Sequence, residues 1–116
     1  MTIQRFETGP RMSQAVVHGN TVYLAGQVAQ RAAGKSVTEQ TRDILETIDK
    51  LLAGAGSDKS KLLSAQIFLT DIATFNEMNK VWEAWVSPGH TPARATVEAK
   101  LAAPQYTVEI MVIAAR

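Results

Sequence analysis

The chain has no cysteine among its 116 residues, and its formal net charge is only +1. Without cysteine there is no disulfide framework, no cysteine-ligated zinc or iron–sulfur site, and no thiol nucleophile. A charge this close to zero argues against electrostatic binding of nucleic acid or of an anionic membrane. No apolar run approaches the roughly 18 residues of a membrane span, and the N-terminal segment lacks the apolar core of a signal peptide. We therefore expect a cytoplasmic protein.

What is present is an ordinary globular composition, with 46% hydrophobic and 20% charged residues. That length and composition suit one domain, which can bury a core without a disulfide or a structural metal. No internal repeat, low-complexity tract or linker divides the chain. Residues 1–116 are therefore predicted to form a single domain.

Two segments have apolar residues at helical spacing. Ser36–Glu39 matches a capping box before the first, and Gly54 and Gly56 are a stop signal after it. The second runs from about Ile72 to Trp85, with Thr74–Glu77 as an alternative capping box. The two apolar faces consist of Ile44, Leu45, Ile48, Leu51 and Leu52, and of Phe75, Met78, Trp82 and Trp85.

Short runs rich in β-forming residues surround these helices. Gly19–Asn20 separates two of them and predicts a hairpin with a type II′ turn. In a later run, Leu63, Ala65, Ile67 and Leu69 alternate and are expected on one face of a strand. The predicted strands are Ile3–Phe6, Ala15–His18, Thr21–Leu24, Lys61–Thr70, Ala95–Ala99 and Thr107–Ala114.

The predicted order is β-β-β-α-β-α-β-β, which indicates an α+β fold. Two amphipathic helices and several strands cover each other's apolar faces most simply when one mixed sheet carries both helices on one side. This arrangement leaves the other face of the sheet bare. Because a small domain rarely leaves such a face uncovered, we expect a homo-oligomer in which sheets pack together.

Two charged residues have apolar neighbours. Glu109 lies inside the apolar strand Thr107–Ile113. A desolvated carboxylate suits general acid–base chemistry, and the alternative is a solvated residue on an edge strand. Arg94 follows Pro92 just before a strand. Its guanidinium could hold a carboxylate through two parallel hydrogen bonds, and the alternative is an exposed arginine at a loop end.

Other candidates carry less information. Asn79 lies beside the apolar stripe of the second helix, where it could bind a ligand or cap a neighbouring backbone. The simplest interpretation of Trp82 and Trp85 is that they are core or interface residues. Gly54–Gly56 ends a helix, so it does not match a phosphate-binding loop, which opens one. No His, Asp or Glu pair has metal-ligand spacing, so we predict no metal site. No serine-nucleophile motif occurs either.

Several short segments together match one known pattern. The most specific is the Pro92–Glu98 segment PARATVE, followed after a short interval by Val108–Ile110. The other segments are Gly19–Asn20, Ala25–Gln27, Ala53–Gly56, Gln66–Asp71 and Phe75–Asn79. In their order and spacing, over nearly the whole chain, they resemble the reactive-intermediate deaminase family, also called RidA or YjgF.

The resemblance implies a chorismate-mutase-like fold and a homotrimer with active sites between subunits. It also implies cofactor-independent hydrolysis of reactive 2-imino and enamine acids to 2-keto acids and ammonia. By the same resemblance, Arg94 is expected to hold the substrate carboxylate, and Glu109 to position or activate water. Asn79 and Gly26 match family positions near the substrate. The implied partners are a small imino or enamine acid and further copies of the chain, without nucleic acid or membrane.

Three pocket positions depart from the best-known members of that family. Ala25 stands where relatives often have serine, Thr96 where they often have cysteine, and Met12 near the place of a tyrosine. Because Arg94 and Glu109 are kept, hydrolysis is the leading hypothesis. The changed lining favours an alternative, a non-catalytic trimer of the same fold that binds a carboxylate metabolite or acts as a regulator.

Overall fold

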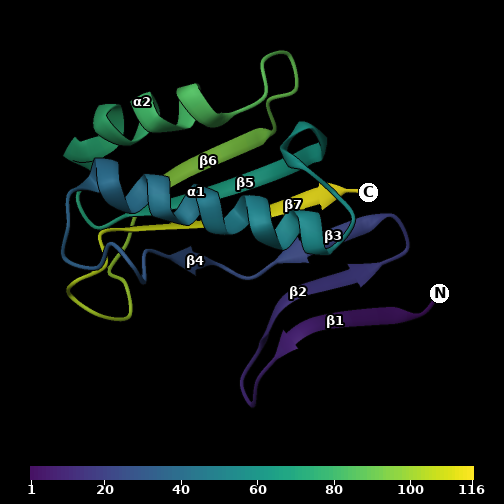
Figure 1. Ribbon diagram of the computed structural model, residues 1–116. Coiled ribbons are helices and arrows are strands. Elements are labelled where there is room, and N and C mark those ends of the chain that lie inside the picture. Colours follow the sequence, from purple (N-terminus) through teal and green to yellow (C-terminus); the bar gives the residue numbers. More distant parts are fainter.

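The computed structural model describes residues 1–116 and contains one seven-stranded sheet with two helices (Figure 1). Both helices lie on the same face of the sheet, as expected. The strands are β1 (Ile3–Thr8), β2 (Ser13–His18), β3 (Thr21–Leu24), β4 (Gln27–Val28), β5 (Leu62–Leu69), β6 (Ala93–Glu98) and β7 (Val108–Ala115). The helices are α1 (Val37–Gly54) and α2 (Phe75–Trp85), with 3₁₀ turns at Lys59–Lys61 and Ile72–Thr74.

The strand order across the sheet is β1-β2-β3-β7-β5-β6, and the short β4 also pairs with β7. Every pairing is antiparallel except that of β5 with β6, which are joined by the crossover through α2. Parallel neighbours require such a crossover, so the sheet is mixed because of α2. The predicted order was wrong by one strand, because β4 has only two residues and carries no pattern of its own.

The boundaries of α1 follow from local signals, as predicted. The Ser36 hydroxyl oxygen accepts a hydrogen bond from the backbone N–H of Glu39 at 3.1 Å, which satisfies one of the free donors at the helix start. At the other end, the Ser57 N–H donates to the Leu52 carbonyl at 2.8 Å, and Gly56 has a φ of +81°. Glycine takes this left-handed conformation without strain, which explains its place after the helix.

Of the two predicted starts of α2, the one at about Ile72 was wrong and the alternative at Thr74 is right, because Thr74 is the residue that precedes the helix. Ile72–Thr74 forms a 3₁₀ turn, and the α-helix begins at Phe75. The Thr74–Glu77 capping box does not form, because both side chains have other partners. Thr74 Oγ1 donates to the Asp71 carbonyl at 2.7 Å, and Glu77 Oε2 accepts from the backbone N–H and hydroxyl of Thr38, each at 2.9 Å.

Of two predictions about the strands, one is confirmed and one is wrong. Gly19 has a φ of +62° while Asn20 has no positive φ, which matches the predicted type II′ turn. The expectation that Leu63 shares a face with Ala65 was wrong. A bulge shifts the register between Leu62 and Ser64, and it leaves Leu63 51% exposed. The extra residue reverses the alternation on that side of the bulge.

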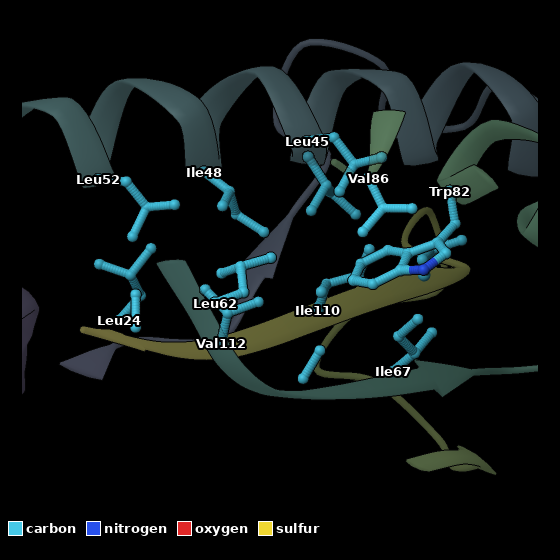
Figure 2. Packing of buried hydrophobic residues seen from close by; sticks show 14 of the residues in the cluster. Leu24, Leu45, Ile48, Leu52, Leu62, Ile67, Trp82, Val86, Ile110 and Val112 are labelled. Atoms are coloured by element: carbon cyan, nitrogen blue, oxygen red, sulfur yellow. The ribbon is translucent and has the colours of Figure 1, made fainter. Parts of the chain in front are cut away.

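The core lies between α1 and the middle strands (Figure 2). Leu45, Ile48 and Leu52 project from α1 toward the sheet, where Leu24 of β3 and Ile110 and Val112 of β7 face the helix. Burial of each such side chain contributes about 1.5–3 kcal/mol. The apolar spacing that predicted a helix is therefore the spacing that covers the sheet.

The opposite face of the sheet has no helix over it. Along β7, buried and half-buried residues alternate, so Glu109, Met111 and Ile113 point away from the helices. Tyr23 pairs with Ile113 and is 45% exposed, and Val97 is 48% exposed. The helix-free face therefore presents apolar side chains around one carboxylate.

Neither helix has the length and the apolar character needed to cross a membrane.

Candidate active site

Arg94 lies near the start of the edge strand β6, on the face that carries the helices. It pairs with Ala65 of β5, whose side chain is buried under the helices. From there the guanidinium reaches α2, where Nη1 donates a hydrogen bond to Asn79 Oδ1 at 2.8 Å. The guanidinium carbon lies 5.7 Å from the ring centroid of Phe75 and 5.5 Å from that of Trp82. One amide oxygen and two aromatic rings therefore surround this cation.

The charge of Arg94 is not neutralised within the chain. The chain's two ion pairs both belong to Arg31, so Arg94 has no carboxylate partner. Partial burial lowers the pKa of the Arg94 guanidinium, and the more distant charge of Glu83 offsets part of that shift. A partly desolvated guanidinium with free N–H groups is a suitable receptor for a carboxylate ligand.

Glu109 lies on β7 and packs against Gly26, which immediately precedes β4. A Cβ atom at Gly26 would collide with Oε2 of Glu109 and would lie only 3.1 Å from its Cδ. A residue without a side chain therefore allows the carboxylate to lie directly against the backbone. Of the predicted site residues, Gly26 and Glu109 are thus brought into contact.

The two charged groups lie on opposite faces of the sheet. The register pairs Arg94 with Ala65 and Ala65 with Val112, and the last two are buried on the helix side. Glu109 pairs instead with Phe68 and points to the helix-free face. One chain therefore contains two separate parts, a cation half-site (Arg94 and Asn79) and a carboxylate half-site (Glu109 and Gly26).

The remaining predicted residues divide between these parts. Thr96 follows Arg94 by two residues on the same face, and its Oγ1 is buried without a hydrogen-bond partner. Ala25 adjoins the carboxylate half-site, and its N–H donates to the Gln14 carbonyl at 2.9 Å. Met12 is 47% exposed in the turn between β1 and β2, on the other side of the molecule from α2 (Figure 1). Met12 therefore lies away from the cation half-site, two residues from Gln14, whose carbonyl accepts the Ala25 N–H.

Sequence reasoning missed the contact of two aromatic residues of α2 with Arg94, because it placed both only in the apolar stripe of the helix. Trp82 is 5% exposed and does belong to the core, and Figure 2 shows its indole reaching toward Ile67 and Ile110. It also contacts Arg94, as does Phe75. The signal was the spacing of Phe75, Asn79 and Trp82, which places all three on one side of a helix.

No group of three or more His, Asp or Glu side chains converges where it could hold a metal ion.

The chain is similar to known sequences over nearly its whole length. The family model described as Endoribonuclease L-PSP matches residues 2–116. A RutC family protein from Haemophilus influenzae is 48% identical over 114 residues, which cover 98% of each chain. The RutC family protein YoaB from Escherichia coli is 46% identical over 115 residues, which cover 99% of each chain. The similarity therefore extends over the whole fold.

Solved structures agree. A YjgF-family protein from Neisseria meningitidis has a TM-score of 0.96 and 46% identity, with 100% of this chain and 96% of that chain covered. The protein YyfA of the Rid family from Yersinia pestis has a TM-score of 0.89 and 28% identity, with 99% of this chain and 100% of that chain covered. The chain thus belongs to the RidA/YjgF family and has its chorismate-mutase-like α+β fold.

Proposed function

We propose that this protein hydrolyses reactive 2-imino and enamine acids to 2-keto acids and ammonia. In this reaction Arg94 binds the substrate carboxylate and Glu109 positions the attacking water. The observation that carries the proposal is the unneutralised Arg94 guanidinium, which hydrogen bonds to Asn79 at 2.8 Å and has no carboxylate partner. An arginine kept in this state is matched to a small anionic ligand.

The arrangement around Arg94 suits a planar carboxylate. Asn79 engages Nη1 and leaves the other N–H groups of the guanidinium free. These groups can donate two parallel hydrogen bonds, which fix the orientation of the ligand as well as its position. Fixing the carboxylate in this way also fixes the adjacent C=N carbon, and correct placement is a large part of catalysis.

The chemistry needs only water and proton transfer. An enamine first takes up a proton on carbon and becomes a protonated imine, and an imine reaches the same state when its nitrogen takes up a proton. Water then adds to the carbon of the protonated imine while Glu109 accepts one of its protons, which gives a neutral carbinolamine. Glu109 returns that proton to the nitrogen and the C–N bond breaks. The remaining hydroxyl proton passes to Glu109 or to water, so that the products are ammonia and a 2-keto acid. No electron is transferred, so no redox cofactor is involved. Acid–base assistance of this kind contributes about 10²–10⁴-fold to a rate.

The two half-sites act together only if different copies of the chain contribute them, because they lie on opposite faces of one sheet. We therefore propose a homotrimer in which Arg94 of one subunit meets Glu109 of a neighbour. The apolar helix-free face around Glu109 supplies a surface for such packing. Light scattering should give the mass of three 12.6 kDa chains. The mass of a single chain at working concentration would contradict the assembly.

Mixed oligomers test the shared site more sharply. Arg94→Ala and Glu109→Gln chains, each inactive alone, should regain part of the activity when they are unfolded, mixed and refolded together. Some interfaces in the mixture then combine an intact Arg94 with an intact Glu109. A mixture as inactive as its components, at normal oligomer mass, would show that both residues must come from one chain.

The activity itself is tested with 2-iminopropanoate and 2-iminobutanoate generated in place from amino acids. Release of ammonia and of the keto acid should be faster with the protein than without it. Arg94→Ala should remove the acceleration. No acceleration by the wild-type protein, or equal acceleration by Arg94→Ala, would rule out the proposal.

A second candidate is a non-catalytic or regulatory trimer that binds a carboxylate metabolite. It is favoured by Ala25 and Thr96, which replace the serine and cysteine that relatives often carry. This alternative predicts saturable binding of a carboxylate without turnover. It is wrong if Glu109→Gln abolishes a measured turnover and leaves ligand binding intact.

The matching family model is named for an endoribonuclease, so RNA is a necessary control substrate. A net charge of +1 gives no basic stripe that would follow a phosphate backbone, and we expect no cleavage of single-stranded RNA. RNA cleavage that persists in Arg94→Ala would assign the protein a different function.

A further inference from the structure

We propose that Phe75 is a positioning residue for Arg94: its ring holds the guanidinium in the orientation that receives the substrate carboxylate. This inference rests on the proposed function, since it concerns the same site. It starts from the contact between the guanidinium carbon of Arg94 and the Phe75 ring, at 5.7 Å from the centroid. Trp82 provides a second ring at 5.5 Å, and Asn79 the hydrogen bond.

The core does not account for the place of Phe75. Its side chain is 38% exposed and lies outside the buried cluster, whereas Met78 and Trp82 on the same helix are 0% and 5% exposed. Phe75 is also the first residue of α2, where no apolar side chain is needed to continue the helix. Its contact with Arg94 gives this exposed ring a role that core packing does not.

An aromatic ring suits this task better than a carboxylate. A carboxylate beside Arg94 would neutralise the guanidinium and would compete with the substrate for its N–H groups. A ring attracts the cation through its π face and leaves the N–H groups at the guanidinium edge free for hydrogen bonds. Phe75 and Trp82 thus restrain a long flexible side chain without occupying its binding edge.

Loss of the Phe75 ring should weaken carboxylate binding and leave the chemistry intact. The ring's attraction corresponds to about a five- to tenfold change in affinity. In Phe75→Leu we therefore expect the Kd for 2-oxobutanoate, a stable probe with the product's carboxylate, to rise by that factor. KM for the imine should rise with it, and kcat should change less than about twofold.

Matched variants separate positioning from a general disturbance. Phe75→Tyr keeps the ring and should bind 2-oxobutanoate like the wild-type protein. Ile72→Ala removes a side chain that is 45% exposed, three residues away, and should also leave binding unchanged. In an Arg94→Gln background, Phe75→Leu should have little further effect on binding, because the cation that the ring positions is gone.

The closing experiment combines calorimetric titration of 2-oxobutanoate with NMR of the Arg94 Nε–Hε group in the ligand-free protein. We expect a ring-shifted, ordered Arg94 signal in the wild-type protein and in Phe75→Tyr, and its loss in Phe75→Leu together with the affinity. Equal affinity and an unchanged signal in Phe75→Leu would overturn the inference. If the wild-type protein binds no 2-oxobutanoate and hydrolyses no imine, the proposed function fails, and the NMR signal still decides whether Phe75 positions Arg94.

Discussion

Arg31 and Arg94 each connect a helix to another part of the chain, but the two cations meet different partners. Arg31 precedes α1 and donates to Oδ1 of Asp43 through Nε at 2.8 Å, with Nη2 at 2.7 Å from the same oxygen. Its Nη2 also contacts Glu46 Oε2 at 3.0 Å. Arg94 has an amide oxygen and two aromatic rings instead, and no carboxylate.

The pKa values of the two groups shift in opposite directions. Side-chain hydrogen bonds to Asp43, and then to Glu46, raise the pKa of Arg31. Burial lowers the pKa of Arg94. A cation that is already neutralised by its own chain supports structure. A cation that is left without a carboxylate is available to a ligand, and this difference distinguishes the two sites.

The largest expected effect is the loss of activity in Arg94→Ala. Without the group that binds and orients the carboxylate, kcat/KM should fall by at least about 10²-fold, while the melting temperature stays nearly constant. The imine assay and thermal unfolding measure the two effects. Arg31→Ala is the matched control and should retain its activity in the folded state. If Arg94→Ala keeps more than a tenth of the wild-type kcat/KM, Arg94 is not the group that binds the substrate carboxylate.

Asp43→Ala should show the opposite pattern, with stability lost and site chemistry kept. Asp43 is 8% exposed, and its Oδ2 accepts the backbone N–H groups of Arg31 and Ala32, each at 3.0 Å. Removing the acceptor should lower the free energy of unfolding by about 2–4 kcal/mol, because buried donors lose their partner. Urea unfolding measures the loss, and Asp43→Asn should lose less. An unfolding free energy within 1 kcal/mol of wild type would contradict the structural role.

Gly26→Ala tests the carboxylate half-site and should have a smaller effect. The new methyl group would occupy the place of Glu109 Oε2, so the flexible carboxylate has to move away from the backbone. We expect kcat to fall by about tenfold, since a carboxylate displaced by about an ångström positions water poorly. The Kd for 2-oxobutanoate should be unchanged, because it depends on Arg94. A change in Kd with kcat preserved would show that the two half-sites are not separate in function.

The sequence was sufficient for elements whose signals are local. The cap at Ser36, the glycine after α1 and the Gly19–Asn20 turn are each specified by neighbouring residues, and each was predicted. Leu63 was placed on the wrong face because the bulge beside it depends on pairing with β7. A two-residue strand such as β4 has too few residues to carry a pattern.

The residues of the candidate site could be singled out from the sequence one by one, but their arrangement could not be predicted. Arg94 and Glu109 each stood out from their neighbours, yet their places on opposite faces depend on the register of three strands. Phe75 was assigned to an apolar stripe because spacing alone does not distinguish a ring that meets the core from a ring that meets an arginine. Phe75 contacts Arg94 of β6, and these two residues, 19 positions apart in the sequence, come together only in the folded chain.

Glu46→Gln should have the smallest effect on stability, and it tests how much the exposed ion pair of Arg31 contributes. The Glu46 side chain is 63% exposed and that of Arg31 is 59% exposed, so solvent screens their pair. The melting temperature should fall by less than about 3 °C in low salt, and the difference should vanish in about 0.5 M salt. A fall of more than about 5 °C that persists in salt would mean that the number of charges around Arg31, and not the buried acceptor Asp43, holds this region together. If the change is as small as expected, Arg31 stabilises this region through its pair with Asp43, whose carboxylate accepts backbone N–H groups inside the chain, and not through its pair with Glu46.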